Sequence, residues 1–296
     1  MPTFGGIEAG GTKFVCAIGS SPDDIQAETS IPTTTPDETL HRVISFFKAH
    51  EHMDQLSSVG IGSFGPIDII QGSPTFGYIT DTPKPTWAYT DIVGRVSRSL
   101  NVPIGFDTDT NAAALGEATW GSARNVRNFV YLTVGTGIGG GGLIEGRLMH
   151  GLLHPEMGHL LVPHDWKEDG YAGSCTFHGD CLEGLASGTA LLGRWGQKGE
   201  DLPPTHRAWD LEAHYLSLGL VNVICTLSPR RIVLGGGVMQ QASLLKRIQL
   251  NVRRLLNDYL RVPEVLNNID QYIVISKLGN RAGVLGAIEL ATMCNN

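Results

Sequence analysis

The sequence predicts an α/β protein built from two similar lobes with a cleft between them. The order strand, glycine-rich turn, strand, helices occurs twice, first from residue 3 and again from residue 129. A chain of 296 residues is long enough for two domains of ordinary size. Alternation of short strands with helical patterns indicates sheets covered by helices, and the absence of a tandem repeat of about 20–50 residues argues against a solenoid.

The first cycle opens with three strands that form a meander. They are expected at Thr3–Ile7, Lys13–Gly19 and Ile25–Ile31, with a tight glycine turn at Glu8–Thr12. A helix start follows at Thr35-Pro36-Asp37-Glu38, because a threonine before proline and acidic residues is typical of an N-cap. The remaining elements of this half are a strand at Val59–Gly62, an irregular stretch at Gly72–Trp87, a helix at Asp91–Leu100, a strand at Pro103–Phe106 and a helix at Thr110–Thr119.

The second cycle repeats the pattern. A strand at Phe129–Val134 leads into the glycine run Gly135–Gly142 and a returning strand at Leu143–Glu145. The later elements are a helix at Leu211–Thr226, a strand at Arg231–Leu234, a helix with its apolar face between Leu244 and Leu256, a strand at Tyr272–Ser276 and a final helix at Arg281–Met293. We expect a first lobe of residues 1–118 and a second of residues 119–280, with residues 281–296 returning to the first.

Composition excludes several classes of protein. The net charge is -7 and no run of 18 apolar residues occurs, so nucleic-acid binding and a membrane span are disfavoured. The N-terminus lacks the basic and apolar regions of a signal peptide, which predicts a cytoplasmic protein. Five cysteines, an odd number, argue against a disulfide framework.

Three glycine clusters are candidates for nucleotide binding. In Glu8-Ala9-Gly10-Gly11-Thr12-Lys13, two glycines let backbone N–H groups approach an anion, and Thr12 and Lys13 add a hydroxyl and a positive charge. Glu8 supplies a carboxylate that could hold Mg²⁺ bridging phosphates. The alternative for this cluster is a plain hairpin turn.

The second cluster, Thr133–Gly142, holds six glycines within eight residues. This is costly in chain entropy for a simple turn, and the cluster matches neither a Walker loop nor a dinucleotide-binding fingerprint. The third, Gly235-Gly236-Gly237, suits a tight turn or close packing against a flat ring such as adenine.

Asp107-Thr108-Asp109-Thr110-Asn111 lies between the first two clusters, at a strand-to-helix junction. Capping of the helix explains one of the two aspartates. The other carboxylate could accept the proton of an attacking hydroxyl during phosphoryl transfer.

A metal site is indicated by Cys175-x2-His178-x2-Cys181, which places three ligands at short spacing in a glycine-bearing loop. A closed tetrahedral zinc site needs a fourth ligand, and His154, His159 and His164 are candidates. His159 is preferred because it lies in Glu156-Met157-Gly158-His159. With no open position the zinc would be structural.

Together these motifs resemble the ROK family of sugar kinases and regulators, within the actin-like ATPase superfamily (ribonuclease H-like fold). The resemblance covers residues 6–286 and rests on E-A-G-G-T-K, N-A-A-A-L-G-E, T-V-G-T-G-I-G-G-G, H-P-E-M-G-H and C-x2-H-x2-C-L-E-G-x2-S-G. The segment G-Y-I-T-D-T-P-K-P-T-W at Gly77–Trp87 is similar to bacterial fructokinases.

The resemblance implies ATP-dependent phosphorylation of the 6-hydroxyl of fructose, with ATP, Mg²⁺ and structural Zn²⁺ as cofactors. It implies that Asp109 is the general base and that the zinc ligands are His159, Cys175, His178 and Cys181. The residues that would bind phosphate or nucleotide are Gly10, Gly11, Thr12, Lys13, Thr133, Gly135, Thr136, Gly137, Gly235, Gly236 and Gly237. Those that would face the sugar are Gly65, Asp109, Glu156, His159 and Glu183.

Three departures favour the fructokinase branch over the glucokinases. Glu8 replaces the usual aspartate, Thr108 stands where many ROK glucokinases have an asparagine, and His178 replaces a cysteine. A kinase for mannose, glucose or another hexose remains the alternative. A sugar-sensing ROK repressor is a remote one, because those carry an N-terminal helix-turn-helix of about 80 residues, whereas here the first glycine turn begins at Glu8. A homodimer is expected by resemblance.

Overall fold

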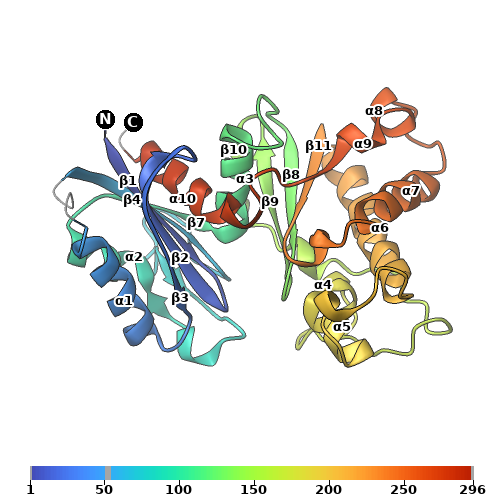
Figure 1. Cartoon of the computed structure of the whole chain (residues 1–296), viewed down its shortest axis with the longest axis horizontal. Coiled ribbons are helices and arrows are strands. Elements are labelled where there is room, and N and C mark those ends of the chain that lie inside the picture. Colours follow the sequence, from blue (N-terminus) through green and yellow to red (C-terminus); the bar gives the residue numbers. More distant parts are fainter. Residues whose placement is uncertain (1, 51–54, 295–296) are drawn as a thin grey trace. The chain divides into compact units, whose positions relative to one another are not determined.

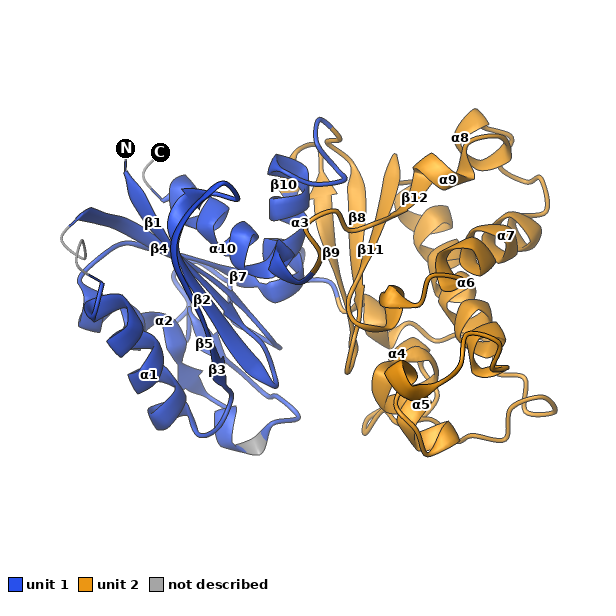
Figure 2. Cartoon of the chain, viewed as in Figure 1, with its two compact units in different colours: residues 1–125, 148–155, 280–296 blue, residues 126–147, 156–279 orange. Residues whose placement is uncertain are grey.

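The computed structural model describes residues 2–50 and 55–294, and within them the chain divides into two compact units (Figure 2). Unit 1 comprises residues 1–125, 148–155 and 280–296, and unit 2 comprises residues 126–147 and 156–279. Unit 1 therefore contains the segment 148–155, which the expected boundary near Thr119 assigns to the second lobe. The last two residues of the expected segment 281–296 lie outside the described residues.

A mixed five-stranded sheet forms the centre of unit 1 (Figure 1). Its order is β3-β2-β1-β4-β7, with β1 at Thr3–Ala9, β2 at Lys13–Ser21, β3 at Asp24–Pro32, β4 at Leu56–Ser63 and β7 at Ile104–Thr108. The first three strands pair antiparallel and confirm the meander, while β4 and β7 continue the sheet parallel to β1. The carboxyl ends of β1, β4 and β7 thus meet at one edge.

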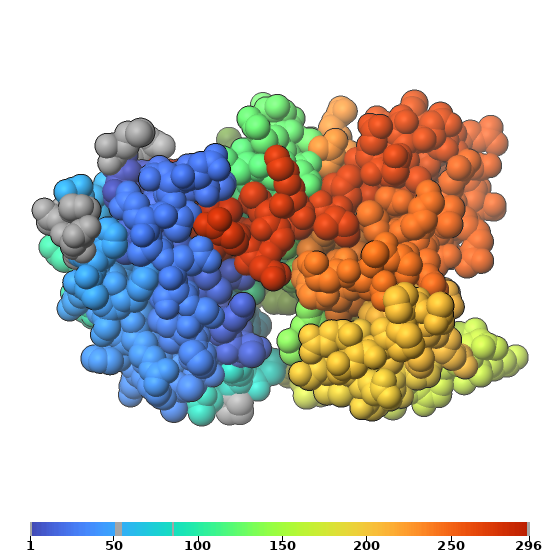
Figure 3. Space-filling view, viewed as in Figure 1, coloured from blue at the N-terminus to red at the C-terminus, as the bar shows by residue number. Residues whose placement is uncertain are grey.

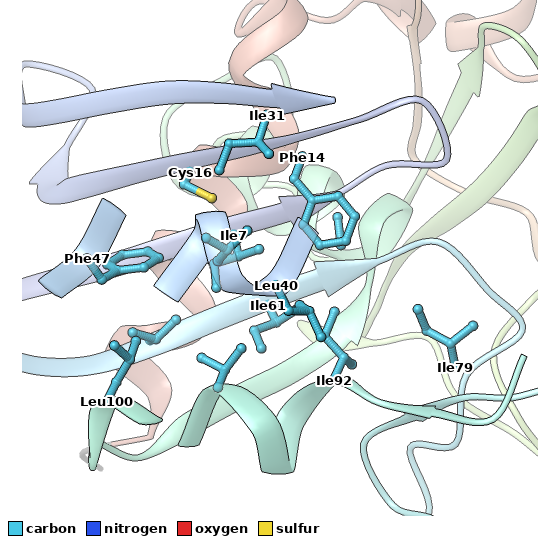
Figure 4. Close-up of a cluster of buried hydrophobic side chains, with 14 of the residues drawn as sticks. Ile7, Phe14, Cys16, Ile31, Leu40, Phe47, Ile61, Ile79, Ile92 and Leu100 are labelled. Carbon is cyan, nitrogen blue, oxygen red and sulfur yellow. The ribbon is translucent and has the colours of Figure 1, made fainter. Parts of the chain in front are cut away.

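The main core of unit 1 lies between this sheet and two helices, α1 at Pro36–Lys48 and α2 at Ile92–Leu100. Helix α1 begins where the sequence predicts, because the Thr35 side chain accepts a hydrogen bond from the Glu38 N–H. Figure 4 shows the apolar side chains of sheet and helices converging, among them Ile7, Phe14, Cys16, Ile31, Leu40, Phe47, Ile61, Ile79, Ile92 and Leu100. All of these are almost fully buried.

Two further helices, α3 at Asp109–Thr119 and α10 at Ala282–Met293, pack against the sheet of unit 1 and against each other. Gly6, Gly60 and Gly105 lie side by side on β1, β4 and β7. A Cβ at Gly60 would lie 1.8 Å from the Ala287 carbonyl oxygen, and at Gly6 and Gly105 2.6 Å from carbonyl oxygens of the same helix. This row of glycines lets the backbone of α10 rest directly on the sheet.

Unit 2 repeats the arrangement with the sheet order β10-β9-β8-β11-β12. Its strands are β8 at Phe129–Val134, β9 at Ile138–Ile144, β10 at Arg147–Leu148, β11 at Arg231–Gly235 and β12 at Ile273–Ile275. As in unit 1, an antiparallel hairpin is followed by two parallel strands. The predicted repetition of strand order is confirmed.

The glycine run Gly135–Gly142 is the main difference from the expected elements. The turn is limited to residues 135–137, and Gly139–Gly142 belong to β9, where they pair with β8. Close packing explains one of these strand glycines, since a Cβ at Gly140 would lie 2.7 Å from the Met157 side chain. The long run is therefore part turn and part closely packed strand.

The remaining helices of unit 2 are α4 at Leu182–Ala186, α5 at Gly188–Trp195, α6 at Ala208–Leu227, α7 at Leu244–Leu256, α8 at Pro263–Leu266 and α9 at Ile269–Tyr272. Helices α6 and α7 pack against each other. In unit 1, the stretch 72–87 that was expected to be irregular contains the short strand β5 at Tyr78–Ile79, which pairs with β6 at Thr90–Asp91.

Within each unit, side chains fill the spaces between the ribbons in the view of Figure 3. Among the helices of the described chain, none has the length and apolar character needed to cross a membrane.

Candidate active site and metal centre

The first predicted phosphate turn lies in unit 1 between β1 and β2. It is closed by a hydrogen bond from the Gly10 N–H to the Lys13 carbonyl oxygen at 3.0 Å. The chain beyond β3 also holds it, since the Thr33 hydroxyl donates to the Gly10 carbonyl oxygen at 2.7 Å and the Thr33 N–H to that of Thr12 at 2.9 Å. The carbonyl oxygens of Gly10, Thr12 and Lys13 are thereby occupied, while the Thr12 and Lys13 side chains are exposed. This leaves a hydroxyl and an ammonium group available to an anion.

Glu8, near the end of β1, directs its carboxylate at the first turn of α10. The carboxylate accepts a hydrogen bond from the Val284 N–H, and a Cβ at Gly283 would lie 2.3 Å from the Glu8 carboxyl carbon. The second carboxylate oxygen, Oε2, is buried and has no hydrogen-bond partner within the described chain. Burial, reinforced by the charge of Asp109 and opposed by Lys13, raises the pKa of Glu8 to about 7. A buried carboxylate oxygen without a partner suits a cation or a bound water.

Asp109 is the first residue of α3 and stands where β7 ends. Its Oδ1 accepts a hydrogen bond from the Thr110 N–H at 2.8 Å. Burial raises its pKa to about 6, although hydrogen bonds from the backbone oppose the shift. A carboxylate with a pKa near neutrality can exchange a proton with a bound hydroxyl.

Asp107, two residues earlier, has a different environment. It is buried, its Oδ1 accepts from the Thr108 N–H at 2.7 Å and from the Asn111 side-chain amide at 2.8 Å, and its Oδ2 lies 2.7 Å from His150 Nε2. The expectation that an aspartate caps the following helix is wrong, because the N-cap is Thr108, whose hydroxyl accepts from the Asn111 N–H at 3.0 Å. Both oxygens of Asp107 are therefore engaged by side chains or backbone, whereas the Asp109 carboxylate accepts from the backbone N–H groups of Thr110 and of Asp109 itself.

Sequence reasoning assigned no role to His150 and considered His154 only as a zinc ligand. In the structure His154 belongs to unit 1, where its Nε2 accepts a hydrogen bond from the Ile67 N–H at 3.1 Å. A Cβ at Gly65 would lie 3.3 Å from this imidazole, and the Gly65–Pro66 peptide bond is cis. His150 pairs with Asp107, a buried aspartate 43 residues earlier in the chain. Because the two residues are far apart in the sequence, no local pattern could have revealed this pair.

The second phosphate turn lies in unit 2 between β8 and β9 and is fixed by the start of α5. The carbonyl oxygen of Gly135 accepts from the Gly188 N–H at 2.7 Å, and that of Thr136 accepts from the Thr189 hydroxyl at 2.7 Å. As in unit 1, neighbouring groups bind the carbonyl oxygens of the turn.

Two other candidate segments lie against this turn. Glu183 Oε2 accepts from the Ile138 N–H at 2.9 Å, and a Cβ at Gly137 would lie 2.4 Å from that oxygen. Gly236 has a φ of 91°, and a Cβ there would lie 2.3 Å from the Val134 carbonyl oxygen. The structure thus brings Gly135–Gly137, Glu183 and Gly236 together in unit 2.

The predicted metal ligands converge in unit 2. Ligand atoms of His159, Cys175, His178 and Cys181 all lie within 4.8 Å of one another. Cys175 Sγ is 3.7 Å from His159 Nδ1 and 3.6 Å from His178 Nδ1, and Cys181 Sγ is 3.6 Å from His159 Nδ1. Zinc bonds of about 2.3 Å to sulfur and about 2.0–2.1 Å to nitrogen in a tetrahedron require sulfur–nitrogen separations of about 3.6 Å. The residues present therefore fit a four-coordinate zinc ion.

The loop that carries these ligands is held in shape by its backbone. Cys175 and Gly179 form an isolated β-bridge, and Gly179 has a φ of 69°, a conformation that favours glycine. Of the other histidines considered, His164 binds Asp180 and the Asp169 carbonyl oxygen instead, both at 3.0 Å. His164 therefore supports the residue next to Cys181 and is not a ligand.

The comparisons with known proteins agree with this geometry. The sequence model of the ROK family matches residues 4–293. The chain is 45% identical to a fructokinase of Streptococcus mutans over 97% of both chains, and 41% identical to one of Zymomonas mobilis over 99% of this chain and 97% of that one. Among solved structures, a ROK hexokinase from Thermus thermophilus superposes with a TM-score of 0.75 at 25% identity over 98% of both chains. The chain belongs to the ROK family.

Proposed function

We propose that this protein is an ATP-dependent fructokinase that transfers the γ-phosphate of ATP to the 6-hydroxyl of D-fructose. The observation that carries the proposal is the identity of 41–45% to fructokinases over nearly the full length of both chains. The five-stranded sheets of both units and the two glycine turns support a kinase that binds phosphate groups through backbone N–H groups.

Asp109 would act as the general base. It would accept the proton of the 6-hydroxyl as that oxygen attacks the γ-phosphorus in line and the bond to the β-γ bridging oxygen breaks. Its position at the start of α3 and its pKa of about 6 support this role. Asp107 is a weaker candidate, because both of its oxygens already have partners.

The two glycine turns would bind the phosphates, with Gly10, Gly11, Thr12 and Lys13 in unit 1 and Thr133, Gly135, Thr136 and Gly137 in unit 2. Gly235–Gly237 would border the adenosine. Lys13 would bring positive charge to the phosphates. Gly65, Glu156, His159 and Glu183 would face the sugar together with Asp109.

Two metals are part of the proposal. Mg²⁺, when bound with ATP, would neutralise charge that develops on the transferred phosphoryl group, and the free Oε2 of Glu8 would hold it directly or through water. Zinc at His159, Cys175, His178 and Cys181 would fix the loop that precedes Glu183. These four residues would fill all coordination positions of a tetrahedral zinc ion, so the contribution of the zinc would be structural.

The proposal is tested by ADP release from the purified protein with ATP, Mg²⁺ and fructose, mannose or glucose. We expect kcat/KM for fructose to exceed that for glucose by about 10-fold or more, which is within the discrimination that differences in hydroxyl contacts provide. Equal rates with all three sugars would favour a general hexose kinase, which the likeness to the Thermus thermophilus hexokinase keeps as the second candidate. A fructose-stimulated rate no higher than the rate without sugar would refute the proposal. We also predict a homodimer, and size-exclusion chromatography with light scattering would test this.

A further inference from the structure

The segment Leu148–Pro155, here called the strap, belongs to unit 1 although the chain on both sides of it belongs to unit 2. Side chains and backbone of the strap contact the rest of unit 1 at several separate points. Leu148 packs against the apolar cluster of Ala112, Leu115 and Leu290, and the Met149 carbonyl oxygen accepts from the Asn111 side chain at 3.2 Å. At the other end, His154 accepts from the Ile67 N–H. The strap is thus fixed at one end to α3, the helix that begins at Asp109, and at the other end to the chain that follows β4.

The pair of His150 and Asp107 lies between these end contacts. Asp107 is 2% exposed and His150 43% exposed, and their 2.7 Å separation is that of a charge-assisted hydrogen bond. Hydrogen bonding to Asp107 raises the pKa of His150 despite partial burial, which favours the charged form of the imidazole. The orientation of Asp107 is itself fixed, because its other oxygen has two donors. A buried, fully oriented carboxylate therefore holds one exposed side chain of the strap.

Asp107 and Asp109 are two residues apart across the extended residue Thr108. Glu156 follows the strap directly, and His159 lies three residues further along. Within unit 1 the strap also borders Gly65, where a Cβ would lie 3.3 Å from the His154 imidazole.

We propose that His150 is a positioning residue for the sugar, which through its hydrogen bond to Asp107 holds the strap in the arrangement that binds the sugar. The inference rests on the proposed kinase function, because Gly65 and Asp109, the proposed sugar residues of the same unit, face a sugar only under that proposal. Without the pair, the strap would populate other positions. The apparent affinity for sugar would then fall in proportion to the fraction of molecules that remain competent to bind it. Saturating sugar would restore the competent arrangement, so kcat would change little while KM would rise.

The test compares two substitutions that differ in reach. In His150→Gln the side-chain amide nitrogen takes the place of Nε2 and retains a donor to Asp107, whereas in His150→Asn the side chain is too short. We expect His150→Asn to raise KM for fructose about 10-fold with kcat within about threefold of wild type, and His150→Gln to remain within about threefold for both. His41→Ala, an exposed histidine on α1, is the matched control and should change neither constant.

Hydrogen–deuterium exchange of the apo protein gives a second readout that does not depend on catalysis. Backbone amides of residues 148–154 should exchange faster in His150→Asn than in wild type or His150→Gln. An unchanged KM or unchanged exchange in His150→Asn would overturn the proposal, and a loss of kcat at constant KM would overturn it in favour of a transition-state contact. If wild-type protein phosphorylates no hexose, the proposed function fails. In that case fructose binding by calorimetry and the exchange pattern still decide whether the pair positions the strap.

Discussion

Substitution of Asp109 by asparagine should move activity and stability in opposite directions. Asparagine keeps an oxygen that can accept from the Thr110 N–H, so the local backbone contact survives while the proton acceptor is lost. We expect kcat to fall about 100-fold or more, which is the ordinary contribution of a general base. ATP binding should be nearly unchanged.

The stability change follows from the pKa of Asp109, which folding raises from 3.8 to about 6. A carboxyl group whose pKa is raised binds protons more tightly in the folded state. Its effect on stability is therefore absent below pH 3.8, and the destabilisation grows as pH rises to about 6 and is complete above it. The difference corresponds to at most roughly 3 kcal/mol. Removing the charge should accordingly raise the melting temperature at pH 7.5 by a few degrees.

The same pKa predicts the acid limb of the pH–rate profile. If Asp109 must be ionised in the free enzyme, kcat/KM should fall about tenfold for each pH unit below about 6. The assay is coupled ADP release, with excess coupling enzyme verified at each pH, together with thermal unfolding of both proteins. An Asp109→Asn protein with near-normal turnover would refute the assignment of the base. A variant that is both inactive and less stable would refute the argument that burial of the charge is costly.

Two other predictions concern the metal centre and the packing of α10. Elemental analysis should find about one zinc per chain, and both Cys175→Ser and a strong chelator should remove it and lower the melting temperature; a metal-free protein of unchanged stability would exclude a structural site. Gly286→Ala should destabilise unit 1 by about 3 kcal/mol or more, because the new Cβ would lie 1.6 Å from the Ala112 carbonyl oxygen. Gly170→Ala, where no atom lies within 4 Å of the new Cβ, is the control, and equal melting temperatures of the two variants would contradict this explanation.

Local patterns were sufficient to predict most elements of both sheets. The meander of β1–β3, the start of α1 at Thr35 and the repetition of strand order could be predicted, because alternation and capping are properties of neighbouring residues. The glycines of β9 were assigned to a turn, because sequence alone does not show that Met157 packs against that strand. The glycine row beneath α10 was missed for the same reason, since Gly6, Gly60 and Gly105 become neighbours only through strand pairing.

The metal centre was the most predictable part of the candidate site. Three of its ligands lie within seven residues, and the fourth is in a motif only 16 residues before Cys175. The aspartates of β7 and α3 were harder to separate, because their sequence contexts are alike. Their environments are not: Asp107 is oriented by three partners, including a histidine from the distant strap. Such a difference depends on tertiary contacts, which spacing does not encode.

Glycine clusters first indicated phosphate binding, but glycine has two separate functions in this chain. In Gly10–Lys13 and Gly135–Gly137 it forms tight turns, which are closed by hydrogen bonds from the Gly10 N–H to the Lys13 carbonyl oxygen and from the Gly135 N–H to the Gly137 carbonyl oxygen. In β1, β4, β7 and α10 it permits backbone to contact backbone. The second function supports the first, because Glu8 and the phosphate turn stand where β1 meets the N-terminus of α10. Displacing α10 by a Cβ at Gly283 would therefore disturb the carboxylate proposed to hold Mg²⁺ before it disturbed the core.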